Sequence, residues 1–200
     1  MSGANASQAA DDGLIVCGIA GSLREKSYNR ALLRAAVELA PAGMQIRIFD
    51  RLAELPPYNA DVEAEGDPEP VRALKDAIAA AGALLIATPE YNHGVPGVLK
   101  NAIDWASRPA GKSPLNRKPA AILGAAAGNA GTARAQLALR QSFVFTETYV
   151  LPRPEVLVGR AAEKFDAEGR LTDEPTRRSL RKLLDALVEW TARFDAARDR

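Results

Sequence analysis

A short polar segment follows the first apolar run of the chain, and its side chains could hold a phosphate group. It reads AGSLREKSYN and carries Ser22, Arg24, Ser27 and Asn29. If a helix begins at about Asn29, its N-terminus presents unpaired N–H groups and a partial positive charge, to which these side chains add donors. The segment is neither a Walker A nor a GxGxxG loop. A plainer interpretation stays open, in which Ser27 or Asn29 only caps the helix and Arg24 is a surface charge.

A second unusual segment, TPEYNHGVPG, follows a later apolar run. Pro89 bends the chain, and Glu90, Tyr91, Asn92 and His93 then crowd polar and aromatic groups into a few residues. A planar heterocycle needs a flat apolar wall together with donors and acceptors along its edge, and this segment offers both. The alternative is an ordinary turn punctuated by proline and glycine. We favour the binding interpretation because a purely connecting turn would be shorter and less polar.

Composition excludes several other chemistries. The chain has one histidine and one cysteine, so it cannot build an internal disulfide, a multi-histidine metal site, a zinc site or an iron–sulfur cluster. The formal net charge is +1, so nucleic acid is not the expected partner. No apolar run reaches the roughly 18 residues of a membrane span. Cys17 lies among apolar residues, which favours core packing over redox chemistry, and for His93 we favour a loop or interface position over proton donation.

The elements that must position these segments alternate between strand and helix, which predicts a parallel sheet with helices on both faces. We expect strands at residues 14–19, 44–49, 83–88, 120–124 and 149–158, and helices at residues 29–40, 70–81, 97–107, 131–145 and from about residue 173 onward.

The strands differ in a way that predicts their order. The first, third and fourth are apolar throughout, as expected of strands buried on both faces. The second carries Gln45 and Arg47 between apolar residues, and the fifth contains Pro152 and Pro154, so both belong at edges. This favours the flavodoxin-like order 2-1-3-4-5, in which ligands bind beyond the carboxyl ends of strands 1 and 3. Both polar segments lie at that place.

The remaining segments complete the expected organisation. Residues 1–12 are small and polar and lack the features of a signal peptide, so we expect a flexible leader followed by a single domain at residues 13–200. We expect a cytoplasmic protein in which Cys17 stays reduced. Residues 51–70 form an acidic, proline-rich connection that is either solvated or a wall of the site or an oligomer contact. Trp105 and Trp190 are expected in the core or at an interface.

Together, GSLREKSYN and TPEYNHGVPGVLKNAIDWASR resemble the NADPH-dependent FMN reductase family, which includes quinone, chromate and azo-compound reductases. The resemblance extends from about Leu14 to Leu157. It implies a flavodoxin-like fold that binds FMN noncovalently and assembles as a homodimer or homotetramer. It further implies a ping-pong cycle in which NADPH or NADH reduces the FMN and a quinone, azo compound, chromate or free flavin reoxidises it. The cofactor carries this chemistry, so no catalytic residue of the protein is expected.

The resemblance also implies which residues contact the FMN. The segment after the fourth strand, GAAAGNAGTARAQ, has Ala125, Ala126 and Ala127 where family members often have serines, so only backbone contacts around Ala126 and Gly128 are expected there. The other expected contacts are with the phosphate, from Ser22, Arg24, Ser27 and Asn29, and with the isoalloxazine ring, from Pro89, Glu90, Tyr91 and Asn92.

Two other function classes remain as alternatives. A flavodoxin-type electron carrier would bind FMN without turning over NAD(P)H, but such carriers tend to be strongly acidic and this chain has a net charge of +1. A regulatory module that binds a phosphate or nucleotide would contain no flavin at all.

Overall fold

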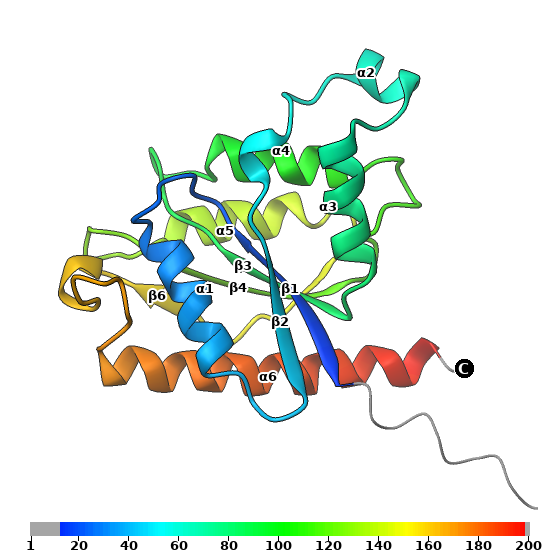
Figure 1. Ribbon diagram of the computed structural model, residues 1–200. Coiled ribbons are helices and arrows are strands. Elements are labelled where there is room, and N and C mark those ends of the chain that lie inside the picture. The colour runs from blue at the N-terminus through cyan, green and yellow to red at the C-terminus, as the bar shows by residue number, and fades with distance from the viewer. Residues whose placement is uncertain (1–12, 199–200) are drawn as a thin grey trace, which may run out of the picture.

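The computed structural model describes residues 13–198, and a parallel sheet runs through the middle of them (Figure 1). The expected leader, residues 1–12, lies outside the described residues. The strands are β1 (Leu14–Ala20), β2 (Met44–Phe49), β3 (Ala83–Ala87), β4 (Pro119–Ala125), β5 (Tyr149–Val150) and β6 (Val156–Val158). Their order is β2-β1-β3-β4-β5, which confirms the flavodoxin-like order.

The fifth strand differs from the prediction. Residues 149–158 form two short strands instead of one, and both β5 and β6 pair in parallel with β4. Leu151 to Glu155 separate them and include Pro152 and Pro154, which have no N–H to donate to a ladder. The prolines therefore interrupt this edge as well as marking it.

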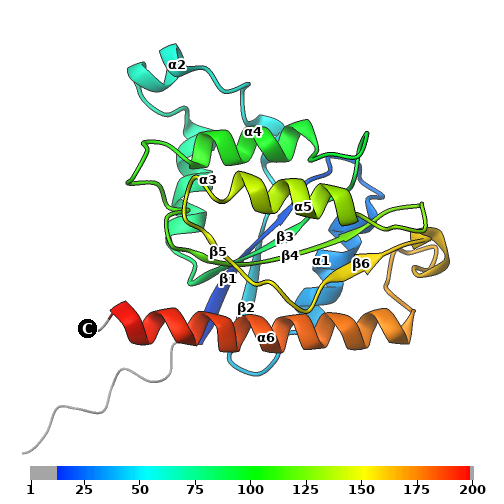
Figure 2. The same ribbon diagram turned by 180° about the vertical axis from the view of Figure 1, so that it is seen from behind.

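Helices cover both faces of the sheet (Figures 1 and 2). α1 (Tyr28–Glu38) and the long α6 (Glu174–Arg198) pack against one face, where they share a hydrophobic core with Val16, Leu85 and Leu123. α3 (Glu69–Ala79), α4 (Gly97–Ala106) and α5 (Ala133–Ser142) cover the opposite face. Successive strand residues point to opposite faces, so one strand feeds both cores.

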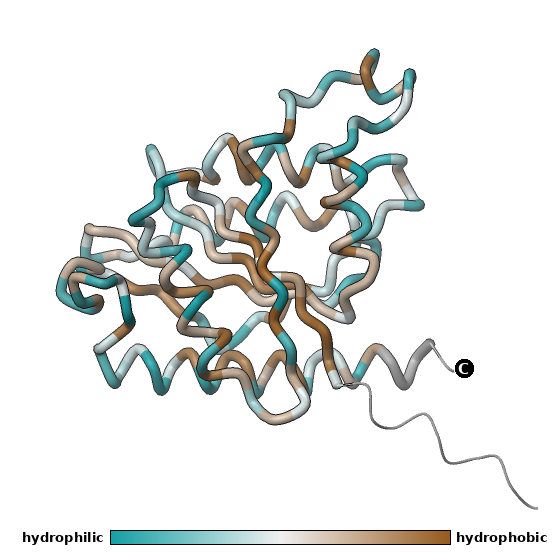
Figure 3. Tube along the Cα trace, in the orientation of Figure 1, coloured by the Kyte–Doolittle hydropathy of each residue, from teal (hydrophilic) through white to brown (hydrophobic). Residues whose placement is uncertain are grey.

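The buried centre follows the apolar strands, which stand out in the hydropathy view (Figure 3). Cys17 is buried in the core under α3 and α4, and this burial raises the pKa of its thiol to about 11. The prediction that Cys17 packs in the core is therefore confirmed. Trp105 is also buried in that core, while Trp190 is half-buried beside the other one and donates to Tyr149 O. None of the described helices is long and apolar enough to span a membrane.

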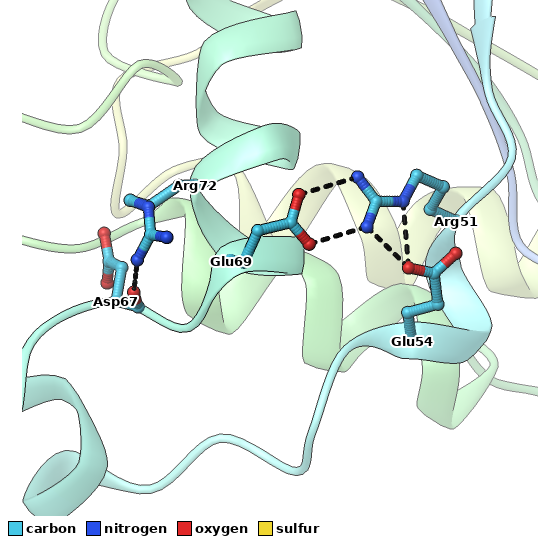
Figure 4. A network of polar contacts seen from close by, with 5 residues as sticks. All are labelled: Arg51, Glu54, Asp67, Glu69 and Arg72. Atoms are coloured by element: carbon cyan, nitrogen blue, oxygen red, sulfur yellow. Dashed lines mark hydrogen bonds and ion pairs between the residues drawn. The ribbon is translucent and has the colours of Figure 1, made fainter.

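Residues 51–70 contain more structure than a plain connection. They include a 3-10 helix, η1 (Leu52–Glu54), and α2 (Ala60–Glu65), which extends away from the sheet (Figure 1). Asn59 caps α2 by accepting a hydrogen bond from Asp61 N. Arg51 binds Glu54 and donates two hydrogen bonds to the Glu69 carboxylate, so η1 is tied to the first turn of α3 (Figure 4). A second short 3-10 helix, η2 (Ala161–Glu163), follows β6.

Candidate functional site

Three loops meet beyond the carboxyl ends of the central strands. We call them the β1 loop (residues 21–27), the β3 loop (residues 88–96) and the β4 loop (residues 126–132). Between them lies a cavity of about 220 Å³. We call it the switch-point cavity, because β2 lies on one side of β1 and β3 on the other, so the strand order reverses at this place. Its lining residues come from all three loops and the start of α1: Ser22, Arg24, Ser27, Tyr28, Asn29, Pro89, Glu90, Tyr91, Ala125, Ala126 and Ala127.

The β1 loop delivers the N-terminus of α1 to this cavity. Ser27 is the N-cap, and its hydroxyl accepts hydrogen bonds from Asn29 N at 3.2 Å and Arg30 N at 3.4 Å. The Arg24 guanidinium donates to Lys26 O at 3.0 Å and forms no ion pair within residues 13–198. The buried Ser22 hydroxyl lies 3.5 Å from the Tyr91 hydroxyl, which is a weak contact. A hydroxyl and a cation at this end are thus available to a ligand.

Asn29 joins the β1 and β4 sides of the cavity. Its side chain is buried, and its Nδ2 donates to Ala125 O at 2.9 Å. Its Oδ1 accepts from Ala125 N, also at 2.9 Å. The carboxamide therefore pairs with both polar groups of one residue at the end of β4, as a neighbouring strand would. Asn29 lines the cavity as expected, but its side chain is used to join the start of α1 to the end of β4.

Glu90 joins the β3 loop to α5. Its carboxylate accepts from Arg134 N and Ala135 N, both at 3.0 Å, and from Arg134 Nε at 2.7 Å. The Glu90 side chain is only 6% exposed. Burial alone would raise its pKa, but the hydrogen bonds from Ala135 N and Arg134 outweigh burial, and the pKa lies below its usual value. Glu90 therefore caps the N-terminus of α5 from a distant loop.

The tip of the β3 loop is a tight two-residue turn. Tyr91 and Gly94 pair through two backbone hydrogen bonds, Tyr91 N to Gly94 O at 3.3 Å and Gly94 N to Tyr91 O at 2.9 Å. The two residues between them have left-handed backbones, with φ of 50° at Asn92 and 62° at His93. Asparagine tolerates this conformation well, which explains an asparagine at this position. Asn92 does not line the switch-point cavity.

The β4 loop carries backbone groups that are already hydrogen-bonded within the protein. The Ala126 N–H already donates to Val158 O at 2.9 Å, so it is not free to contact a cofactor in this structure. Gly128 does not line the cavity, and its carbonyl accepts from Arg160 N at 3.1 Å. Gly124 just before the loop cannot carry a side chain, because a Cβ there would lie 2.2 Å from both Thr88 O and Thr132 Oγ1. The alanine side chains thus give this wall an apolar surface.

The structure brings most of the expected residues to one cavity. Those from the sequence that line it are Ser22, Arg24, Ser27, Asn29, Pro89, Glu90, Tyr91 and Ala126; Asn92 and Gly128 do not. Tyr28 also lines the cavity and was not expected. Its ring packs against Phe165, with centroids 5.3 Å apart. The signal was its position immediately after the helix cap, where a side chain borders whatever the helix N-terminus binds.

The cavity fits the two ends of a noncovalent FMN. Ser22, Arg24 and the N-terminus of α1 supply the donors that a phosphate needs. Pro89, Tyr91 and the alanines of the β4 side supply an apolar wall for a flat ring. Within residues 13–198, no cluster of histidine, cysteine or acidic side chains could hold a metal ion.

Comparison with known proteins agrees with this geometry. Residues 15–163 match the family model described as NADPH-dependent FMN reductase. The chain is 52% identical to an NAD(P)H-dependent FMN reductase of Pseudomonas aeruginosa, over 92% of this chain and 98% of that protein. It is 43% identical to a quinone reductase of Pseudomonas putida, over 86% and 91% of the two chains.

A solved structure extends the comparison to three dimensions. FerB, a flavoenzyme NAD(P)H:(acceptor) oxidoreductase from Paracoccus denitrificans, superposes with a TM-score of 0.82 at 38% identity, covering 90% of this chain and 98% of that one. The sequence match, the fold and the position of the cavity agree, and the chain belongs to the NADPH-dependent FMN reductase family.

Proposed function

We propose that this protein is an FMN-dependent NAD(P)H oxidoreductase that passes reducing equivalents to a small-molecule acceptor. The observation that carries the proposal is the switch-point cavity, which combines phosphate-binding groups at one end with an apolar wall at the other. Membership in the NADPH-dependent FMN reductase family supports FMN as the cofactor.

In this proposal Ser22, Arg24 and the N-terminus of α1 bind the phosphate of FMN. Pro89, Tyr91 and Ala126 contact its ring system. Asn29 and Glu90 act as positioning residues, because their side chains fix the β4 side and α5 instead of reaching the ligand. The bound cofactor supplies the hydride and electron transfer between NAD(P)H and the acceptor, so the protein needs no nucleophile of its own.

The names of the relatives support one class of acceptor. Relatives from Pseudomonas putida and Escherichia coli are named quinone reductases, and one from Burkholderia is named 2-hydroxy-1,4-benzoquinone reductase. We therefore propose a quinone as the first acceptor to test, with azo compounds, chromate and free flavin as further candidates.

Oligomer formation and location are also part of the proposal. Leu137, Val144 and Phe145 lie on α5 and just after it and are 63%, 76% and 65% exposed. Exposed large apolar side chains within residues 137–145 favour a homodimer or homotetramer contact, which light scattering of the purified protein would measure. A reducing cytoplasm would suit the free Cys17, and cell fractionation would test that location.

The function is tested by a visible spectrum of the purified protein, followed by NADPH and then a quinone under nitrogen. We expect the bands of oxidised flavin, bleaching on addition of NADPH or NADH, and return of the bands with the quinone. Flavin bands that respond to neither nucleotide would support an electron carrier instead. Absence of flavin bands, with no uptake of added FMN, would overturn the cofactor assignment.

A further inference from the structure

The segment between β6 and α6 lies beside the switch-point cavity without lining it. We call residues 160–171 the β6 strap. The strap begins with Arg160 and η2 and then turns back on itself, so that Phe165 and Leu171 pair as a short antiparallel bridge. It lies next to the start of α1 and to the β4 loop (Figures 1 and 2). None of its residues was expected in the site, and none of them lines the switch-point cavity.

Backbone hydrogen bonds attach the beginning of the strap to the β4 loop. Ala161 N donates to Ala126 O at 3.1 Å, and Arg160 N donates to Gly128 O, also at 3.1 Å. Ala161 is completely buried. Because Ala126 lines the switch-point cavity, the first residues of the strap are fixed to one of the cavity walls.

The strap is also attached to the start of α6. Lys164 and Asp173 form an ion pair of 2.8 Å, and both side chains are largely buried. Asp173 also accepts a hydrogen bond from Thr176 N at 2.9 Å in the first turn of α6. The hydrogen bonds from Lys164 and Thr176 lower the pKa of Asp173 to about 2, so the carboxylate stays charged at neutral pH. Phe165, directly after Lys164, is therefore held by attachments on two sides.

Phe165 connects the strap to a residue that lines the cavity. Its side chain is only 8% exposed and belongs to the hydrophobic core under α1 and α6. The ring of Tyr28 packs on it, with the ring centroids 5.3 Å apart and the ring planes tilted by 32°. Tyr28 is the first residue of α1 and lines the switch-point cavity. Phe165 thus contacts the site from outside the cavity.

The backbone of Tyr28 carries a donor that a phosphate group can use. The Ser27 hydroxyl accepts hydrogen bonds from Asn29 N and Arg30 N. No residue in the described part of the chain accepts a hydrogen bond from Tyr28 N. This N–H belongs to the helix N-terminus at which the proposed function places the phosphate of FMN. Its direction depends on how the first turn of α1 is held, and the packing of Tyr28 on Phe165 holds that turn.

We propose that Phe165 is a positioning residue for the phosphate of FMN and acts through Tyr28. This inference rests on the proposed function for the identity of the cofactor. Phe165 fixes the ring of Tyr28 and so aims the first turn of α1 at the phosphate. Because the Tyr28 contact lies at the phosphate end of the cavity, Phe165 determines the affinity for the phosphate and not the affinity for the ring system.

Flavin titrations of Phe165→Leu test the inference without turnover. Leucine keeps an apolar side chain in the core and removes the ring that packs on Tyr28. Fluorescence titrations of the flavin-free chain would compare FMN with riboflavin, which has the same ring system but no phosphate. We expect FMN to bind about fivefold or more weakly, since charge-assisted hydrogen bonds need a fixed geometry, and riboflavin affinity to change by less than about twofold. Equal losses for the two flavins, or no loss for FMN, would overturn the inference.

Two further variants separate positioning from general loosening of the core. Phe143→Leu makes the same change in the core on the opposite face of the sheet, where Phe143 is 1% exposed and does not line the cavity. It should bind FMN like the natural protein, and a loss equal to that of Phe165→Leu would contradict the inference. Phe165→Tyr keeps the ring, and its hydroxyl can enter the hollow of about 620 Å³ that Phe165 borders. This variant should retain the natural affinity for FMN.

A double-mutant cycle tests whether Phe165 acts through Tyr28. Tyr28→Leu should weaken FMN binding, and the double variant Tyr28→Leu/Phe165→Leu should bind FMN no more weakly than Tyr28→Leu alone. Additive losses would show that Phe165 does not act through Tyr28 and would overturn the inference. Failure of the proposed function has a different result, because the natural protein itself would then bind no FMN.

Discussion

The β1 loop and the β3 loop border the same cavity and are similarly polar, but their side chains do different work. In the β1 loop, Arg24 donates only to the nearby Lys26 carbonyl, and Ser22 makes one weak contact. In the β3 loop, the Thr88 hydroxyl donates to Pro89 O, and the Glu90 carboxylate is taken up by the start of α5. The β1 loop thus leaves Arg24 and Ser22 largely free, while the β3 loop commits Thr88 and Glu90 to hydrogen bonds within the protein.

This difference separates residues that bind a ligand from residues that position the binders. Both kinds have the polar side chains expected at a site, so residue type alone does not distinguish them. The hydrogen-bond partners of each side chain within the protein distinguish the two kinds of residue. Substitutions of free groups should weaken ligand binding and leave the free energy of unfolding unchanged, while substitutions of committed groups should change both.

The strongest test is Asn29→Ala. Asn29 lies beside the β1 loop, but its side chain, like that of Glu90, is hydrogen-bonded to a distant backbone. Its removal leaves the buried N–H and C=O of Ala125 without those partners. We expect the free energy of unfolding to fall by about 2–4 kcal/mol, since each unsatisfied buried group costs about 1–3 kcal/mol. FMN retention should weaken as well. Denaturant unfolding and flavin fluorescence would measure the two effects.

Asn101→Ala is the matched control. The Asn101 carboxamide also bridges a backbone segment, accepting from Tyr58 N at 2.8 Å and donating to Pro56 O at 2.9 Å, but it does not line the switch-point cavity. It should lose stability without losing FMN affinity. Equal FMN affinity in Asn29→Ala and the natural protein would remove Asn29 from the site altogether.

Glu90→Ala should have the next largest effect. It removes the cap from two N–H groups of α5 and the bond to the Arg134 side chain, which together predict a loss of about 1.5–3 kcal/mol. Arg134→Ala should cost less than about 1 kcal/mol, because the Arg134 side chain is 50% exposed and exposed ion pairs are weak. Similar losses in the two variants would show that the ion pair, not the helix cap, is what matters.

The effect of Glu90 should also depend on pH. The fold lowers the pKa of Glu90 from its usual value of 4.5, so its contribution to stability is fully present above that pH. The contribution disappears as the pH falls through the lower pKa of the folded state. Unfolding curves of the natural protein and Glu90→Gln should therefore converge in acid and stay separated at neutral pH. A gap that widens in acid would contradict this assignment.

Arg24→Ala tests the opposite kind of residue. The Arg24 side chain is exposed and bonds only locally, so the free energy of unfolding should change by less than about 0.5 kcal/mol. FMN should bind about tenfold more weakly, since a charge-assisted contact to its phosphate is lost. Lys26→Ala is the control. Lys26 carries the same charge two residues from Arg24, but its side chain does not line the cavity. If both variants lose affinity equally, Arg24 acts only through long-range charge.

Features whose cause lies in neighbouring residues could be predicted from the sequence, and features that depend on a distant partner could not. The sheet order was readable because Pro152 and Pro154 mark an edge by their own chemistry, and that order placed the loops. The role of Asn29 could not be predicted, because its partner Ala125 is 96 residues away in the chain. Glu90 likewise bonds to residues 44 and 45 positions later. A polar side chain can be assigned to a site from sequence, but its commitment to a distant backbone needs the fold.

Substitution of His93 has the smallest expected effect, and it tests whether the β3 loop takes part in the chemistry. It lies exposed on the turn of the β3 loop, with φ of 62°, and does not line the switch-point cavity. Asparagine accepts this backbone conformation, so His93→Asn should keep the turn and leave kcat within about twofold of the natural value. A general acid would instead contribute on the order of 10²–10⁴ in rate and leave its own inflection in the pH profile of kcat. Because His93 is the one histidine of the chain, loss of such an inflection in the variant could come from no other imidazole. A large fall in kcat with that signature would make the tip of the β3 loop a chemical participant instead of a shaped wall.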